Sequence, residues 1–195
     1  MSNFDVRRGA RVCLCLVLLF VLLWGGWGLQ PAATAAPTGG RYDESQVKAV
    51  FVYNLLHFVY WPSSFGAQEK NCRIVVLGSL QIAENLKVLT AGETFRGKRV
   101  SVELCRRITD VGECCILFVG SEFLPEMSVI LRHIGNRPVL LVGEGDGFLS
   151  AGGMVNFVSR DRRVTLEINP EAARQVGITF NSRLLRLARI VKPSH

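Results

Sequence analysis

The chain has 195 residues, 49% of them hydrophobic, and carries a net charge of +7. This length is long for one small domain and short for two, so it argues against a two-domain protein and favours a single core. No internal repeat or low-complexity segment interrupts the sequence.

The first 36 residues have the pattern of a secretory signal peptide. Three arginines precede an unbroken apolar run at residues 12–23, and the small-residue segment PAATAAP follows. We expect cleavage after Ala35 or Ala36. The alternative is an uncleaved signal anchor, because an apolar window extended through Trp27 approaches the length of a membrane span.

Export into the periplasm would leave a linker at residues 37–42 and one domain at 43–195. Removal of residues 1–36 takes away three basic residues and one acidic residue, which leaves a net charge of +5. The excess is concentrated late, in Arg183, Arg186 and Arg189, and no acidic residue follows Arg174. Such a face can attract nucleic acid, acidic partners or anionic lipid, or can simply be a solvated helix face. Export argues against nucleic acid.

Four cysteines follow the signal peptide: Cys72, Cys105, Cys114 and Cys115. An even number in an oxidising compartment favours at least one disulfide. The cysteines lack the spacing of a zinc site, so the sequence predicts no metal centre.

The first element of the domain is a helix expected from Asp43 to Tyr60. Asp43 or Ser45 can cap its start, and Pro62 stops it. It is apolar nearly all round, so it must bury more than one face. One face can pack on the sheet, and the other then needs a second copy of the chain or a different protein. The alternative is complete burial within the monomer.

Short apolar runs then alternate with helical spacing. Strands are expected at residues 73–77, 99–104, 116–119 and 138–142, with helices at 81–89 and 122–134. Apolar strands separated by helices indicate a parallel sheet covered on both faces.

The pattern changes after Gly147. Residues 154–158 and 163–168 read as an antiparallel hairpin, Asn169 and Pro170 open a helix, and a last helix spans 182–191. The predicted fold is therefore a single-domain α/β three-layer sandwich, with a mostly parallel sheet and an appended antiparallel hairpin.

The strand assignment bears on the cysteines. Cys72 and Cys114 each precede a strand, so both lie at the amino-terminal end of the sheet, and a Cys72 to Cys114 bridge is expected if the strands are neighbours. Cys105 ends its strand at the opposite edge, which makes a Cys105 to Cys115 pair less favourable. Either thiol can instead remain free and buried.

Signatures of common enzymes are absent from the sequence. The loop GEGDG at residues 143–147 follows a strand, but its glycines do not fit a dinucleotide fingerprint. His57, His133 and His195 form no constellation with a nucleophile. The sequence therefore predicts neither an enzyme nor a cofactor, and it leaves a small-ligand pocket at residues 143–147 as the alternative to a protein-binding role.

The chain resembles the YfiR-like family from about Val47 to Val191. The segments that carry the resemblance are KAVFVYNLLHFVYWP (48–62), CRIVVLG (72–78), CCILFVG (114–120), PVLLVG (138–143), GFLSAGGMVNFV (147–158), VTLEIN (164–169) and NSRLLRLARIV (181–191). The resemblance implies an α/β sandwich that often dimerises and that represses a membrane-bound diguanylate cyclase from the periplasmic side. It also implies sequestration by an outer-membrane lipoprotein, and it matches a Cys72 to Cys114 bridge.

Two features depart from the family pattern. His57 stands where the family usually has lysine, which makes it a polar rim residue, and residues 143–153 lack the cysteines of a second disulfide. The residues expected to contact a partner or a second copy come from the first helix and from the C-terminal edge of the domain. They are Phe51, Tyr53, Asn54, Phe58, Trp61, Glu167, Asn169, Arg183, Arg186 and Arg189.

Overall fold

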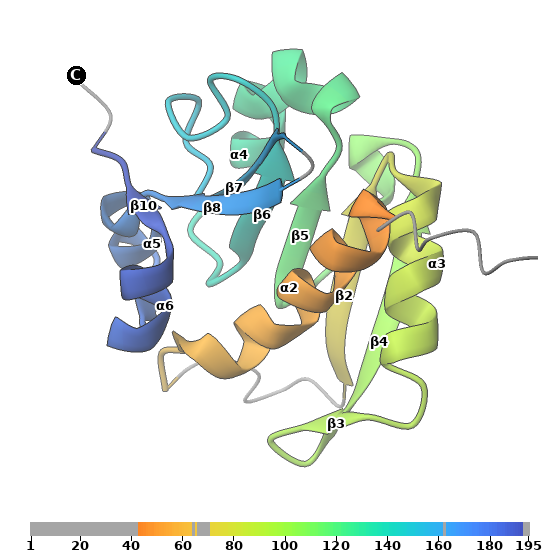
Figure 1. Ribbon diagram of the computed structural model, residues 1–195. Helices are drawn as coiled ribbons and strands as arrows, with labels where there is room; N and C mark the ends of the chain where they lie inside the picture. Colours follow the sequence, from red (N-terminus) through yellow and green to blue (C-terminus); the bar gives the residue numbers. More distant parts are fainter. Residues whose placement is uncertain (1–42, 64, 66–70, 162, 193–195) are drawn as a thin grey trace, which may run out of the picture. The chain divides into compact units, whose positions relative to one another are not determined.

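A mostly parallel sheet of eight strands organises the fold (Figure 1). The computed structural model describes residues 43–63, 65, 71–161 and 163–192. The predicted signal peptide and linker therefore lie outside the described residues. The five central strands are all parallel, in the spatial order β4 (Lys98–Cys105), β2 (Asn71–Leu77), β5 (Ile116–Val119), β6 (Leu140–Glu144) and β7 (Val155–Arg160).

Shorter strands complete the two edges of this sheet. At one edge β8 (Arg163–Ile168) pairs antiparallel with β7, and β10 (Arg189–Ile190) runs parallel beside β8. At the other edge β3 (Thr94–Phe95) pairs antiparallel with β4. A separate two-stranded antiparallel sheet joins β1 (Val59–Tyr60) to β9 (Thr179–Phe180). The predicted α/β class, with its parallel sheet and appended hairpin, is confirmed.

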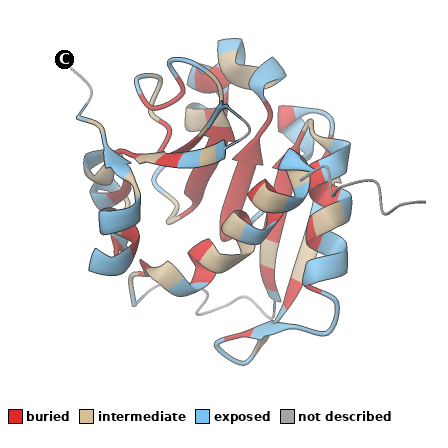
Figure 2. Cartoon of the chain, viewed as in Figure 1, coloured by how far each residue is buried: buried red, intermediate tan, exposed pale blue. Residues whose placement is uncertain are grey.

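Both faces of the sheet are covered. Every residue of β5 is buried, as expected for a strand between two layers (Figure 2). On one face, the Phe51 ring of α2 (Glu44–Phe58) lies 6.1 Å from the Phe157 ring of β7. Gly143 faces the other side and lies against the buried Phe148, and α4 (Met127–Ile134) lies on that side in Figure 1.

Two helices begin directly after a residue whose side chain caps them. Asp43 caps α2 by accepting a hydrogen bond from the Ser45 backbone N–H at 3.1 Å. Ser79 caps α3 (Leu80–Leu89). Helix α2 ends at Phe58 rather than at the expected Tyr60, because residues 59 and 60 are extended and pair with β9.

The helix expected at residues 122–134 is divided in two. Pro125 lies within the 3₁₀ helix η2 (Ser121–Glu126), and α4 follows it to Ile134. Proline has no backbone N–H, so it cannot extend a regular α-helical ladder across this point. Gly135, with φ of 57°, closes α4. A second 3₁₀ helix, η1 (Ile108–Asp110), follows β4.

The C-terminal region confirms one helix start and corrects another helix end. Asn169 caps α5 (Pro170–Gln175), with the Ala172 backbone N–H donating to its side-chain oxygen at 3.3 Å. The predicted helix at 182–191 is wrong beyond Leu187. The helix α6 (Ser182–Leu187) stops there because Ala188 is extended and the chain joins the sheet edge as β10.

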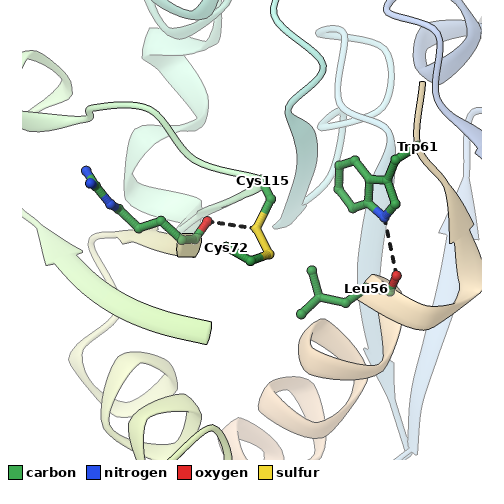
Figure 3. Close-up of a disulfide and its surroundings, with 5 residues drawn as sticks. Leu56, Trp61, Cys72 and Cys115 are labelled. Atoms are coloured by element: carbon green, nitrogen blue, oxygen red, sulfur yellow. Dashed lines mark hydrogen bonds between the residues drawn. A yellow bond between two sulfur atoms is a disulfide. The ribbon is translucent and has the colours of Figure 1, made fainter. Parts of the chain in front are cut away.

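The predicted cysteine pairing is also corrected. The disulfide joins Cys72 to Cys115, with a Cα–Cα distance of 5.9 Å, while Cys105 and Cys114 are free (Figure 3). Strands β2 and β5 are neighbours, as the pairing argument required. The Cys115 backbone N–H donates to the Arg73 carbonyl oxygen at 2.8 Å. This bond draws Cys115, rather than Cys114, alongside the start of β2.

Candidate interaction surface

The second face of α2 is partly covered by the chain itself. Its core-facing residues are buried, and on the opposite side the His57 ring packs edge-to-face between two other rings. Its centroid lies 5.6 Å from that of Tyr53 and 5.4 Å from that of Phe95 in β3. The Tyr53 hydroxyl donates to the Glu93 carboxylate at 3.0 Å. The edge hairpin β3–β4 therefore contacts the side of α2 that the sequence left without a neighbour.

The predicted contact residues of α2 differ in their accessibility. Trp61 is only 7% exposed, stacks on Phe65 with ring centroids 4.2 Å apart, and donates from Nε1 to the Leu56 carbonyl oxygen at 3.3 Å (Figure 3). It is a core residue. Asn54 and Phe58 are half-buried, so they retain surface that a partner could cover.

The end of α2 is joined directly to the C-terminal segment. The Asn181 backbone N–H donates to the Phe58 carbonyl oxygen at 2.9 Å. The Asn181 side-chain amide donates to the Tyr60 hydroxyl at 3.3 Å, and Asn181 also caps α6. Figure 1 shows the end of α2 beside α6. The structure therefore brings the predicted aromatic and basic groups onto adjoining elements.

The predicted basic and edge residues serve different roles. Arg189 pairs with Glu167 across the β10–β8 ladder, and Asn169 is buried as the cap of α5. Arg183 and Arg186 are exposed on α6, and neither has an ion-pair partner among the residues that the structure describes. Asn169 is thus a structural residue, while these two arginines face solvent.

An ion-pair network that the sequence analysis missed fixes the start of α2. The side chain of Lys48 is 9% exposed and pairs with Glu44 on its own helix and with Glu144 at the end of β6. The Ser159 hydroxyl donates to Glu44. The spacing of Glu44 and Lys48 was visible in the sequence, but Glu144 comes from the GEGDG loop, 96 residues away. Its carboxylate is committed to Lys48.

The hydrogen bonds of this network shift the pKa values of Lys48 and Glu44. Burial by itself would lower the pKa of Lys48, but its hydrogen bonds to Glu144 and Glu44 outweigh burial, so the pKa is raised. The hydrogen bonds from Lys48 and Ser159 lower the pKa of Glu44. Lys48 and Glu44 are therefore both charged at neutral pH.

Asn156 is a second feature that the sequence analysis missed. It is 4% exposed in β7, and its Oδ1 has no hydrogen-bond partner among the described residues. In the sheet it lies between Gly143 of β6 and Glu167 of β8. A buried acceptor without a donor is costly, so its presence needs an explanation. The polar residue within the apolar run MVNFV was the available signal.

The remaining reactive side chains show no catalytic arrangement in the described part of the chain. Burial raises the pKa of the Cys114 thiol to about 12 and also raises the pKa of Cys105. Both thiols therefore stay protonated, the unreactive form, at neutral pH. His133 Nε2 lies 2.7 Å from the Val111 carbonyl oxygen, a contact that ties α4 to the loop after η1.

The described residues lack two further features. They contain no group of three or more His, Cys, Asp or Glu side chains placed to hold a metal ion. None of their helices combines the length and the apolar character that crossing a bilayer demands.

Comparison with known proteins gave one family match. The sequence model of the family described as YfiR/HmsC-like matches residues 45–189. No curated protein matches the sequence.

Two solved structures are similar to the chain in fold. One is a conserved domain protein from Vibrio cholerae O1 biovar El Tor, with a TM-score of 0.50, 14% identity and 76% of this chain covered. The other is an ABC domain from Streptococcus pneumoniae, solved in complex with L-Trp, with a TM-score of 0.50, 11% identity and 75% of this chain covered. The chain spans 60% of the length of each. At such low identity the likeness shows the fold alone.

Proposed function

The chain belongs to the YfiR/HmsC-like family, and from this premise we propose that it represses a membrane-bound diguanylate cyclase by binding the cyclase's periplasmic sensor domain. The family consists of periplasmic regulators that act through protein partners. In this proposal the chain itself handles no cyclic dinucleotide. Its binding holds the cyclase inactive across the membrane, which lowers cyclic di-GMP in the cytoplasm and so limits attachment and biofilm formation.

The observation that carries this proposal is the junction between α2 and the C-terminal segment. Half-buried Phe58 and exposed Tyr60 lie on elements that adjoin α6, where Arg183 and Arg186 face solvent. Aromatic residues and arginine are the side chains most enriched at protein interfaces and at their energetic centres. We infer that the cyclase's sensor domain covers the aromatic part of this junction, at Phe58 and Tyr60.

Two further partners belong to the same proposal. A second copy of the chain forms a homodimer, in which the accessible side of α2 supplies part of the interface. An outer-membrane lipoprotein competes for the repressor and relieves repression by sequestering it. Both expectations follow from the resemblance, and the partly accessible residues Phe51, Tyr53 and Asn54 are their candidate contacts.

Gene deletion with complementation tests the proposal. Deleting the gene is expected to raise cellular cyclic di-GMP, and the wild-type gene is expected to restore the lower level. A Phe58→Ala, Tyr60→Ala variant should be exported at a normal level but fail to restore it, whereas Val88→Ala, which changes an exposed residue of α3, should restore it fully. An unchanged cyclic di-GMP level after deletion would refute repression of a cyclase.

A second candidate function is supported by Asn156. We infer that a small polar ligand could donate a hydrogen bond to its Oδ1, which lacks a partner among the described residues and lies between Gly143 and Glu167 in the sheet. The chain would then be a periplasmic ligand sensor that acts on another membrane sensor protein. The change Asn156→Leu keeps the branched shape of the side chain and removes the acceptor.

Thermal unfolding with a panel of periplasmic metabolites tests this second function. A ligand at a concentration far above its Kd raises the melting temperature by mass action. The rise should disappear in Asn156→Leu. If no metabolite stabilises the wild-type protein, the sensor hypothesis loses its support.

A further inference from the structure

The exposed side of α6 and β10 combines cations with aliphatic side chains. We call this the C-terminal basic surface and define it as Arg183, Arg186, Leu187, Ile190 and Lys192. In α6, residues 183, 186 and 187 follow helical i, i+3, i+4 spacing, so they share one stripe, while Leu184 on the other side is buried. Leu187 is 77% exposed and Ile190 is 43% exposed. The side chains of Leu187 and Ile190 are therefore exposed to solvent, and they lie between cationic residues in the sequence.

The charge of this surface is not neutralised within the described residues. The acidic groups Glu167 of β8 and Glu171 of α5 are already paired, with Arg189 and Arg174 respectively. Arg183, Arg186 and Lys192 have no ion-pair partner there. Three cations without an ion-pair partner on one short segment give this surface a positive potential, which attracts an anionic partner.

We propose that the C-terminal basic surface binds anionic phospholipid at a membrane surface, with Leu187 and Ile190 entering the head-group region. Cations interleaved with solvent-exposed aliphatic side chains are the pattern of segments that lie in a membrane interface. Arginine pairs well with phosphate because its planar guanidinium donates two parallel hydrogen bonds. Exposed Tyr60, hydrogen-bonded to the cap of α6, adds an amphipathic side chain next to this surface.

This proposal rests on the periplasmic location of the family and does not depend on repression of a cyclase. An exported regulator that associates with the inner membrane is concentrated in two dimensions near any membrane-bound partner. Each cation close to an anionic surface strengthens binding about fivefold, so loss of Arg183 and Arg186 should weaken it on the order of 25-fold. Binding should also weaken as salt rises.

Vesicle co-sedimentation tests the proposal, with protein purified from the periplasm after expression of the whole chain. Vesicles of equal parts phosphatidylglycerol and phosphatidylcholine should bind it, and vesicles of phosphatidylcholine alone should not. Arg183→Glu with Arg186→Glu should abolish binding. The matched control, Arg106→Glu with Arg132→Glu, makes the same charge change at exposed arginines outside this surface and should retain most of the binding. Far-ultraviolet circular dichroism verifies folding of each variant.

A second pair of variants tests insertion of the aliphatic groups. Leu187→Trp should show a blue shift of tryptophan emission on adding anionic vesicles, whereas Val88→Trp, at a residue 79% exposed on α3, should not. Inorganic phosphate should weaken vesicle binding only at concentrations at which any salt weakens it. Competition at lower phosphate concentrations would indicate a site for free phosphate instead of a lipid surface.

Three outcomes would overturn the lipid proposal. The first is no binding to anionic vesicles, and the second is equal loss of binding in the test and control charge variants. The third is a charge variant that fails to complement the gene deletion while the wild-type protein does not bind vesicles. That result would assign the surface to an acidic protein partner instead. A failure of repression alone leaves the vesicle result unaffected, so the two proposals fail separately.

Discussion

Lys48 shows how one side chain connects the start of α2 to the sheet. Its ammonium group is largely buried between the Glu44 and Glu144 carboxylates. Replacing it with methionine keeps the aliphatic volume but leaves Glu144 without its cation. We expect Lys48→Met to lower the free energy of unfolding by about 1–3 kcal/mol, because a partly buried carboxylate loses its partner. Urea denaturation measures this change. The control is Lys87→Met, which changes an exposed residue of α3.

The same network predicts a pH dependence. The pKa of Glu44 lies below its ordinary value of 4.5 in the folded chain. Its contribution to stability is therefore present above that value and is lost as the pH falls through the lowered folded pKa. We expect the wild-type protein to lose stability more steeply than Lys48→Met below pH 4.5. Chemical denaturation at about pH 3 to 5, the range in which carboxylates titrate, measures the difference. If the free energy of unfolding falls with pH at the same slope in both proteins, the assignment is contradicted.

The cysteines give a prediction that separates neighbouring residues. The Cys72–Cys115 bridge closes a sequence separation of 43 residues. Its removal in Cys115→Ala should cost about 4 kcal/mol in the chain-entropy description of disulfides. Cys114→Ala should leave the bridge in place and cost far less. Peptide mapping under non-reducing conditions identifies the pairing, and a Cys72–Cys114 peptide from the wild-type protein would contradict it.

At the scale of elements, the Phe148 ring of the loop after β6 packs directly on Gly143 of the sheet. A Cβ at Gly143 would lie 2.5 Å from the Phe148 ring and 2.9 Å from the Val119 carbonyl oxygen. Phe148 is fully buried, so it cannot move aside. Gly143→Ala should therefore destabilise the protein by about 1–3 kcal/mol through overpacking.

A matched glycine provides the control for this prediction. A Cβ at Gly112 would meet only the far end of the Arg73 side chain, at 3.2 Å, and that end can shift. Gly112→Ala should change stability by less than about 0.5 kcal/mol. Comparable losses in both variants, measured by chemical denaturation, would show that the packing around Phe148 is not the cause.

At the scale of the whole molecule, export is the prediction that governs every functional proposal. We expect the purified periplasmic protein to begin at residue 36 or 37, and intact-mass measurement checks this. A protein that retains the apolar run at 12–23 and fractionates with membranes would instead support the signal anchor. The same preparation reports the oligomeric state by sedimentation, where a dimer is expected.

Much of the fold was predictable because its signals are local. The run ILFV at β5, the caps Asp43 and Asn169, and the hairpin of β7 and β8 depend on side-chain type within a few residues. The two-residue strands β1 and β10 carry no such signal, since their extension comes only from pairing with distant strands. For this reason the sequence-based predictions placed the C-terminal ends of α2 and α6 too far along the chain.

The candidate surface was likewise predictable only in part. Aromatic and basic residues were identified from composition and spacing, but their exposure was not: Trp61 and Asn169 are buried, while Arg183 and Arg186 are exposed. Burial depends on which elements meet, and a helix that is apolar all round does not specify what covers each side.

The sequence by itself determined the parallel sheet, the caps at Asp43 and Asn169 and the late excess of positive charge, because each follows from residue type and short-range spacing. Only the tertiary structure decided that Cys115 rather than Cys114 bonds Cys72, that Lys48 pairs with Glu144, and that the end of α2 meets α6. These depend on contacts between residues 43, 96 and 123 positions apart. Such contacts form only when the sheet brings separate segments of the chain side by side.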